Sequence, residues 1–326
     1  MTEAEAFDKF DDRLKLNPAE RLRAEKCHNE ITLLLKAAGL ITGAFLQGSF
    51  ARKTMIRPLR DIDKVVILAD SLLGLSPDDV MDRLEDVLRV KYPKATFDRT
   101  RHSLKIDFGD DSFCFDVVPA WETTTNDDDV LIANRESGQW DRSNTRELMR
   151  VVAKRNEDCE GQFIHVVRMM KYLVAVGMEV EGTIPGLHVE SIVYAGMQGP
   201  IPYAEACVSM IETAIRVLDG GYTDPTGCDP ISNRLTVNAR LNARSAFQVA
   251  AAKAREARAL AEAGDHANSI RVWHDLFAEP FPNAKEQSLG AALASALGGS
   301  VTSTGHVSRT SAARQSAPPT RSWKSS

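Results

Sequence analysis

The sequence lacks the features of an exported, zinc-stabilised or membrane-spanning protein. Its five cysteines are scattered, with no C-x-x-C pair and no histidine at metal-ligand spacing nearby, which argues for a reducing compartment and against structural zinc. The first residues carry acids where a secretory signal carries basic residues and an apolar run. The most apolar window, residues 31–46, is broken by Lys36 and Gly39 and is too short to span a bilayer. We therefore expect a cytoplasmic protein that does not enter a membrane.

An excess of positive charge is also missing. Lys and Arg number 40 against 45 Asp and Glu, which gives a formal net charge of −5. The chain is therefore not a general nucleic-acid coat, and we expect no stable nucleic-acid template. The hydrophobic share of 43% and the charged share of 26% are ordinary for a soluble globular protein. A chain of 326 residues is long enough for two packed lobes.

The order of periodic segments predicts an α+β fold with two lobes. A first helix starts at Asn17-Pro18 and stops at Gly39. Strand-forming runs follow, interrupted by a helix that starts at Ser76-Pro77. From Asn144 onward a period of 3.6 residues predicts helices almost throughout. We expect an amino-terminal helical segment that bridges the lobes (1–39), a sheet-bearing core (40–143), a helical lobe (144–297) and a tail (298–326).

The tail differs in composition from the rest of the chain. Ser, Thr, Gly, Ala and Pro dominate it, and it holds four basic residues and no acid. It therefore carries +4 and leaves −9 on the remaining chain, and we predict that it is disordered. Contact with nucleic acid or an acidic partner and a solvated tail without a partner are both open.

The motif Gln47-Gly48-Ser49 precedes a pair of carboxylates, Asp61 and Asp63, that opens a strand-forming run. Residues at i and i+2 of a strand point to the same face, so the two acids can hold a divalent metal together. The Gly-Ser pair offers backbone N–H groups and a hydroxyl where the phosphates of a nucleotide need donors. This combination is typical of a site that polymerises nucleotides.

A third acid, Asp116, lies inside an apolar strand-forming run. A carboxylate in such surroundings is costly unless it is paired or binds a cation. Phosphoryl transfer to a hydroxyl uses metal ions held by carboxylates to align the attacking oxygen and to neutralise charge on the α-phosphate. If the strand of Asp116 pairs beside that of Asp61 and Asp63, the three acids converge on such a metal site.

Each motif alone has an ordinary structural interpretation. A D-x-D pair can be edge-strand acids that discourage aggregation, and a Gly-Ser pair is common in turns. The ordered combination of an apolar lead, the Gly-Ser pair, a basic segment, D-x-D and a later Asp favours catalysis.

This constellation resembles the polymerase-β-like nucleotidyltransferase superfamily. Within this superfamily, the chain resembles most specifically the CD-NTase family of bacterial cGAS/DncV-like enzymes. The segments that carry this resemblance are GSFARKTMIRPLRDID and, further along, FDVVPAW. Four later segments are also similar to that family and extend the resemblance to about residue 283: IANRESGQW, RMMKY, Asp224-Pro225-Thr226 and WHDLFAEPFP. The resemblance implies a polymerase-β-like lobe with a mixed sheet and flanking helices, a mainly helical lobe, and an active site in the cleft between them.

The resemblance also implies roles for individual residues. Gly48 and Ser49 would hold the donor triphosphate, Asp61 and Asp63 would ligate Mg²⁺, and Asp116 would complete the metal site, with Mn²⁺ as a substitute ion. The implied reaction joins nucleoside triphosphates, ATP among them, into a cyclic oligonucleotide. That product would act as a second messenger in anti-phage defence (CBASS).

Five further residues are candidates for nucleotide binding. Lys171 shares a helix face with Arg168 and would reach the phosphates from the helical lobe, unless it is a surface lysine whose head group extends to solvent. Arg52 would also face the phosphates, as would the neighbouring Lys53, although we expect at least one of these two to lie in a solvated loop. Ser191 would bond the nucleotide and Tyr194 would stack on a base, with core packing as the alternative for Tyr194.

Two other functional classes remain open. One is a polymerase-β-like transferase that adds nucleotides to RNA, a protein or a small molecule. An enzyme that tails RNA favours a basic groove, whereas this chain without its tail is acidic. The other is a non-catalytic nucleotide-binding sensor, against which the presence of all three acids argues. The residues do not decide whether a partner protein or the basic tail regulates the chain.

Overall fold

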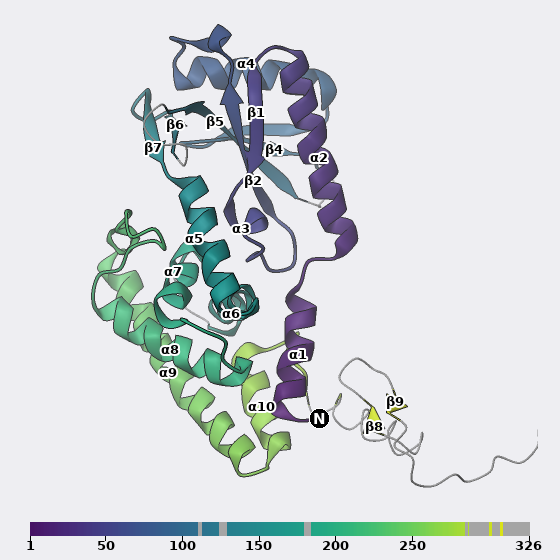
Figure 1. Ribbon diagram of the computed structural model, residues 1–326, viewed down its shortest axis with the longest axis vertical. Helices are drawn as coiled ribbons and strands as arrows, with labels where there is room; N and C mark the ends of the chain where they lie inside the picture. Colours follow the sequence, from purple (N-terminus) through teal and green to yellow (C-terminus); the bar gives the residue numbers. More distant parts are fainter. Residues whose placement is uncertain are drawn as a thin grey trace, which may run out of the picture.

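The computed structural model describes residues 1–109, 113–123, 129–178, 184–283 and 286, and the backbone of 300–301 and 307–308. These residues form a lobe built on one mixed sheet, with a lobe of helices below it (Figure 1). The tail predicted to be disordered lies outside the described residues, except for strands β8 (Ser300–Val301) and β9 (Val307–Ser308), which pair antiparallel. Within the described part of the chain, no helix has both the length and the apolar character needed to cross a bilayer.

The sheet has seven strands in the order β1-β2-β5-β4-β3, with β6 added beside β5 and β7 beside β6. Strands β2 and β5 run parallel, and the other neighbours are antiparallel. This arrangement confirms the predicted mixed sheet and α+β class. The strands are β1 (Ile41–Leu46), β2 (Asp61–Leu68), β3 (Thr96–Arg99), β4 (Leu104–Asp107), β5 (Cys114–Glu122), β6 (Val130–Asn134) and β7 (Gln139–Ser143).

Alternation along β2 divides its side chains between the two faces of the sheet. Ile62, Val66 and Leu68 belong to the core under helices α2 (Pro18–Ala37) and α4 (Pro77–Lys91). Val65 and Ile67 pack in a smaller cluster on the opposite face. Because Asp63 and Asp61 are two and four positions before Val65 on the strand, they lie on the same face as Val65, away from α2 and α4.

The first 37 residues span both lobes (Figure 1). Helix α1 (Glu3–Leu14) buries Phe7 and Phe10 in the helical lobe, whereas α2 buries Ile31 and Leu35 against the sheet. The predicted start of α2 is confirmed, because the side chain of Asn17 accepts a hydrogen bond from the N–H of Ala19 at 2.9 Å. Helix α1 was not a separate prediction, although a capping box marks its start at Thr2.

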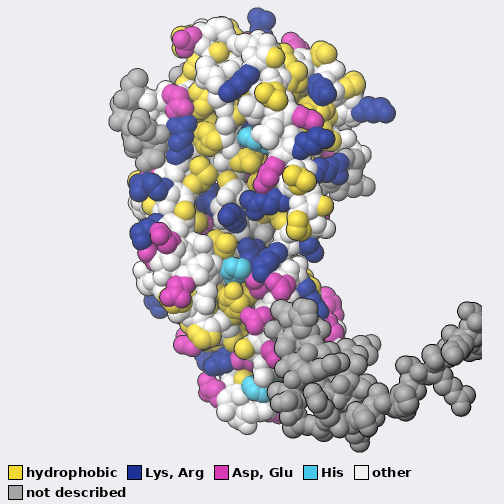
Figure 2. Space-filling model, turned by 45° about the vertical axis from the view of Figure 1, so that its right-hand side comes forward, with side chains coloured by type: hydrophobic (Ala, Val, Ile, Leu, Met, Phe, Trp, Pro, Cys, Tyr) yellow, Lys and Arg dark blue, Asp and Glu magenta, His cyan; other side chains and the backbone are white. Residues whose placement is uncertain are grey.

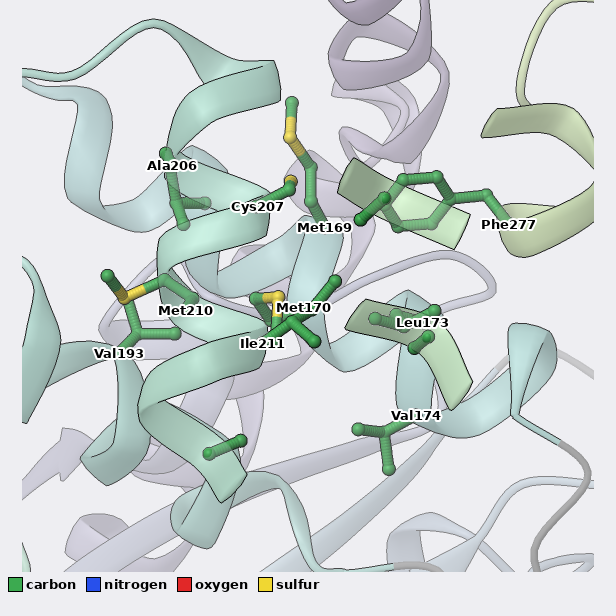
Figure 3. Close-up of a cluster of buried hydrophobic side chains, with 14 of the residues drawn as sticks. Met169, Met170, Leu173, Val174, Val193, Ala206, Cys207, Met210, Ile211 and Phe277 are labelled. Carbon is green, nitrogen blue, oxygen red and sulfur yellow. The ribbon is translucent and has the colours of Figure 1, made fainter. Parts of the chain in front are cut away.

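The helical lobe follows the sheet directly. Its core brings together Met169 and Met170 of α6, Cys207 and Met210 of α8, and Phe277 of α10 (Figure 3). The helices are α5 (Thr145–Asp158), α6 (Gln162–Tyr172), α7 (Gly186–Gly196), α8 (Tyr203–Asp219), α9 (Val237–Glu262) and α10 (His266–Phe277). One π-helical turn, η2 (Leu173–Gly177), continues α6, and such turns are frequent at functional sites.

One charged side chain is fully buried on the helix-covered face of the sheet. Lys64 of β2 is 0% exposed, and its Nζ donates to the carbonyl of His28 at 2.8 Å and to Thr32 Oγ1 at 2.5 Å. Burial lowers the pKa of Lys64 to about 7, and burial followed by the nearby Lys64 charge lowers the pKa of His28 to about 4. The Lys64 ammonium therefore titrates near neutral pH in the folded protein.

We expect this lysine to make stability rise with pH above neutrality. An unfolded lysine keeps its proton up to about pH 10, so between pH 7 and that value the unfolded state binds more protons and a pH increase favours the folded state. Lys64 should add about 1.5 kcal/mol to the free energy of unfolding between pH 7 and 8.5. Urea unfolding of the natural chain and Lys64→Met at both pH values measures this increment. An equal rise in the variant would contradict the assignment to Lys64.

Candidate active site

The sheet register brings two of the three predicted acids side by side. Parallel pairing of β2 with β5 sets Asp63 opposite Asp116 and Asp61 opposite Cys114. Antiparallel pairing of β4 with β5 sets Lys105 opposite Asp116. The strands therefore place Asp63, Asp116 and Lys105 in one row across the sheet, with Asp61 two positions along β2 on the same face.

Gly48 allows the Gly-Ser turn to approach the acids closely. Helix α3 (Gly48–Ala51) follows β1 immediately, and the N–H of Gln47 donates to the carbonyl of Asp63 at 2.9 Å. Gly48 has a φ of +70°, and a Cβ at this position would lie 1.8 Å from Asp63 Oδ2. A glycine is needed here both for its backbone conformation and for the space that the carboxylate occupies.

Burial and the charge of a neighbouring acid make Asp63 and Asp116 reluctant to ionise, and for Asp116 that neighbour is Asp61. The pKa of Asp63 is raised by burial first and by Asp116 second, although Arg52 acts to lower it. Burial also raises the pKa of Asp116, and the hydrogen bond from Ser103 Oγ at 2.8 Å works in the opposite direction. Carboxylates in this situation gain from a nearby cation.

The third acid does not converge on the other two. Asp61 Oδ1 accepts a hydrogen bond from Lys105 Nζ at 2.8 Å, and the Asp61 side chain is 51% exposed. Among the described residues, no three His, Cys, Asp or Glu side chains are grouped closely enough to hold a metal ion. The donor set nevertheless suits Mg²⁺, since three carboxylates share one face. To bind the ion, the Asp61 carboxylate would have to give up its hydrogen bond with Lys105.

A cavity of about 680 Å³ opens between the lobes beside these acids. Gly48, Ser49, Asp61 and Asp63 line its sheet side, and Lys171 lines its helical side. The segment 174–176 of η2 also lines this cavity, so the π-helical turn forms part of its wall. On the face drawn in Figure 2, Lys and Arg side chains gather at the middle of the molecule, between the two lobes.

A second cavity of about 760 Å³ shares Gly48, Arg52 and Asp63 with the first. Gln47 lines this second cavity, together with residues of the loop 224–230. The side chain of Arg52 is only 8% exposed, whereas Lys53 is exposed, so the solvated residue of this pair is Lys53. Asp63 therefore lies where the two cavities meet, whereas Asp61 lines the first cavity and Asp116 lies beside Asp63 in the sheet.

Lys171 lies at the cleft but is held inside the protein. It is 9% exposed, and its Nζ donates to Thr54 Oγ1 at 3.1 Å. The alternative of a surface lysine is therefore wrong. Its helical neighbour Arg168 contacts Asp11 and the carbonyl of Lys53 instead of the cavity.

The structure does not bring Ser191 and Tyr194 to either cavity. Ser191 is buried in α7, and its hydroxyl donates to the carbonyl of Leu187 at 2.9 Å. The ring of Tyr194 packs edge-on against Phe163 and lies under the guanidinium of Arg155 at 4.0 Å. The proposed nucleotide contacts of both residues are thus corrected to packing roles, because α7 turns these side chains into the helical lobe.

Thr54 and Glu190, which lie behind the cleft wall and contact its residues Arg52 and Lys171, were missed by the sequence-based prediction. Both are 0% exposed, and Glu190 Oε2 accepts a hydrogen bond from Thr54 Oγ1 at 2.8 Å. The available signal was the lone acid in the apolar helical run HVESIVY, since a buried carboxylate needs a partner.

Known proteins match this chain over most of its length. Residues 1–156 match the family model of the Second Messenger Oligonucleotide or Dinucleotide Synthetase domain. A probable cyclic nucleotide synthase of Bacillus cereus (strain VD146) is 23% identical over 274 residues, which cover 73% of this chain and 82% of the relative. A cyclic AMP-AMP-GMP synthase of Enterobacter hormaechei is 22% identical over 309 residues, which cover 74% of this chain and 81% of the relative.

Solved structures share the fold at low sequence identity. CdnC of Escherichia coli MS115-1, solved with ATP, has a TM-score of 0.70 at 17% identity over 87% of this chain and 99% of CdnC. A second CdnC structure contains a HORMA protein and has a TM-score of 0.65 at 18% identity, with the same coverage of both chains. DncV of Vibrio cholerae, solved with GTP, has a TM-score of 0.68 at 13% identity over 87% of this chain and 97% of DncV.

The mixed sheet, the Gly-Ser turn against β2 and the acids on β2 and β5 define an α+β nucleotidyltransferase fold. Within this class the sequence motifs, the matching domain model and the relatives agree. The comparisons confirm the resemblance to the CD-NTase family recognised in its motifs, with residues 1–156 matching the synthetase domain.

Proposed function

We propose that this chain joins nucleoside triphosphates into a cyclic oligonucleotide second messenger and releases pyrophosphate. The observation that carries the proposal is the position of Asp63 at the junction of two cavities, with Asp116 beside it in the sheet. Two nucleotides, one in each cavity, would meet with their reacting atoms at these acids. The names of the two curated relatives, both nucleotide synthases, support the same reaction.

Each residue of the proposed site has a distinct role. Asp61, Asp63 and Asp116 would hold Mg²⁺, which supplies charge neutralisation at the α-phosphate and at the leaving pyrophosphate when bound. Gly48 and Ser49 would donate to the triphosphate of one nucleotide, and Arg52 and Lys171 would face its outer phosphates. The ribose hydroxyl of the other nucleotide attacks the α-phosphorus, and Asp116 takes up its proton.

We also propose nucleoside triphosphates, with ATP or GTP among them, as substrates and a regulatory protein as partner. The CdnC structure with ATP and the DncV structure with GTP support the first, and the CdnC complex with a HORMA protein supports the second. The product would act on a separate effector in anti-phage defence.

Product analysis tests the reaction directly. The purified chain is incubated with radiolabelled ATP, GTP, CTP and UTP, singly and mixed, with Mg²⁺ or Mn²⁺, and the products are treated with phosphatase. A labelled product that resists phosphatase and disappears with EDTA is expected, because a ring has no terminal phosphate. A linear, phosphatase-sensitive product would instead identify another nucleotide-adding transferase, and no product from any mixture would contradict catalysis.

A further inference from the structure

A buried carboxylate joins the two lobes directly behind the wall of the cleft. Glu190 of α7 is 0% exposed, and its Oε1 accepts a hydrogen bond from Arg52 Nε at 2.6 Å. Its other oxygen accepts from Thr54 Oγ1 at 2.8 Å and lies 3.5 Å from Lys171 Nζ. Arg52 and Thr54 follow α3 in the sheet lobe, whereas Glu190 and Lys171 belong to the helical lobe. These four residues therefore form one hydrogen-bonded group across the lobe boundary.

This group carries two cations and one anion in a nearly dry environment. The side chains of Arg52 and Lys171 are 8% and 10% exposed. Burial acts to raise the pKa of Glu190, but Arg52 and Lys171 outweigh it and lower the pKa. Burial lowers the pKa of Lys171, and Glu190 partly offsets this effect. Without Glu190, the two buried cations would lose the carboxylate that pairs with both of them, which is costly in the interior.

The two cations are also the ones that border the cavities. Lys171 lines the cavity that contains the Gly-Ser turn, and Arg52 lines both cavities. Glu190 binds Arg52 through Nε and is its one side-chain partner among the described residues, so the terminal guanidinium nitrogens remain available to a ligand. Because one carboxylate neutralises one of the two cations, a net positive charge remains for an incoming polyphosphate.

We infer that Glu190 is a positioning residue that holds Arg52 and Lys171 at the phosphate-binding wall and couples this wall to both lobes. The inference rests on the proposed function, because it takes a nucleoside triphosphate as the ligand. Thr54 transmits the restraint, since its hydroxyl donates to Glu190 and accepts from Lys171.

The decisive variant is Glu190→Gln, which keeps the shape of the side chain and removes its charge. We expect KM for the nucleotide to rise by about 10- to 100-fold, because breaking a buried hydrogen-bonded charge pair has effects of this size. The kcat should change by less than about threefold, because Glu190 does not touch the reacting atoms. Calorimetric titration with α,β-methylene-ATP and Mg²⁺ should show a matching loss of affinity.

A matched control separates positioning from general destabilisation. Glu3 is also a buried carboxylate, and its Oε1 accepts from Trp273 Nε1 at 2.7 Å and from Ser269 Oγ at 3.1 Å, at the contact of α1 with α10. Glu3→Gln should lower Tm and leave KM and analogue affinity unchanged. If Glu190→Gln does not fold, Thr54→Val is the second variant, with a smaller rise in KM expected.

The inference is overturned if the folded Glu190→Gln variant keeps the KM and analogue affinity of the natural chain. If Glu190→Gln does not fold, the same result in Thr54→Val overturns it. An equal rise in KM in Glu3→Gln would also overturn it, since destabilisation alone would then explain the effect. Failure of the proposed function gives a different result: the natural chain forms no product with any nucleotide. The calorimetric comparison of natural chain and variants decides the role of Glu190 in that case as well.

Discussion

Replacement of Asp63 by asparagine is expected to reduce product formation by at least about a thousandfold, the scale seen when a central electrostatic group of an active site is lost. Asp63 lies at the junction of both cavities and opposite Asp116 in the sheet. Asparagine keeps the shape of the side chain but loses the charge that a metal ion needs. Incorporation of label from nucleoside triphosphates, followed over time, measures the loss.

The same substitution should not destabilise the metal-free protein. Because burial and Asp116 raise the pKa of Asp63, its charge opposes folding at pH 7, and this cost disappears as pH falls through the folded-state pKa. Tm of Asp63→Asn at pH 7 should therefore equal or exceed that of the natural chain. Asp107→Asn is the matched control, an exposed acid of the same sheet outside both cavities, and it should retain full activity. Activity near the natural level in Asp63→Asn would exclude this acid from the reaction.

Replacement of Gly48 by alanine should have the second largest effect. The added Cβ would lie 1.8 Å from Asp63 Oδ2 and would force a φ of +70° on a residue with a side chain. Either the turn or the carboxylate must move, and displacements of this kind cost about a hundredfold in rate. The free energy of unfolding should also fall by about 2–4 kcal/mol, as expected for strain combined with overpacking. Product formation and urea unfolding measure the two effects.

Gly39 provides the matched control for this prediction. Its φ is +69°, almost the same as that of Gly48, but no atom lies within 4 Å of the position of an added Cβ. Gly39→Ala should therefore cost only the backbone strain, about 1 kcal/mol, and should leave activity unchanged. If both variants lose activity equally, the close approach of Gly48 to Asp63 is not the cause.

Local signals allowed several elements to be predicted from the sequence. The start of α2 at Asn17-Pro18 and that of α4 at Ser76-Pro77 are encoded in capping side chains within three residues. Neither strand of the β6–β7 hairpin was predicted, and the polar segment Gln139–Ser143 of β7 lacks an apolar alternation. It forms a strand because it pairs with β6, and this contact is made by the fold.

The candidate site was also predictable from the sequence only in part. Gly48-Ser49 and the D-x-D pair could be recognised because their spacing along the chain is itself the signal. Ser191 and Tyr194 were assigned to the nucleotide by residue type, but the orientation of α7 turns them into the core. Side-chain direction on a helix depends on which face packs, and sequence spacing alone does not fix that face for an apolar helix such as α7.

The sequence by itself determined the chemistry that is available: three carboxylates, a Gly-Ser pair and a lysine that interrupts an apolar run. Only the tertiary structure decided which of these groups meet. Pairing of β2 with β5 brings Asp63 beside Asp116. Packing of the lobes joins Glu190 to Arg52, and Asp61 forms an ion pair with Lys105. These contacts join residues dozens of positions apart in the chain. Their formation depends on burial and register across the whole fold, which no local pattern contains.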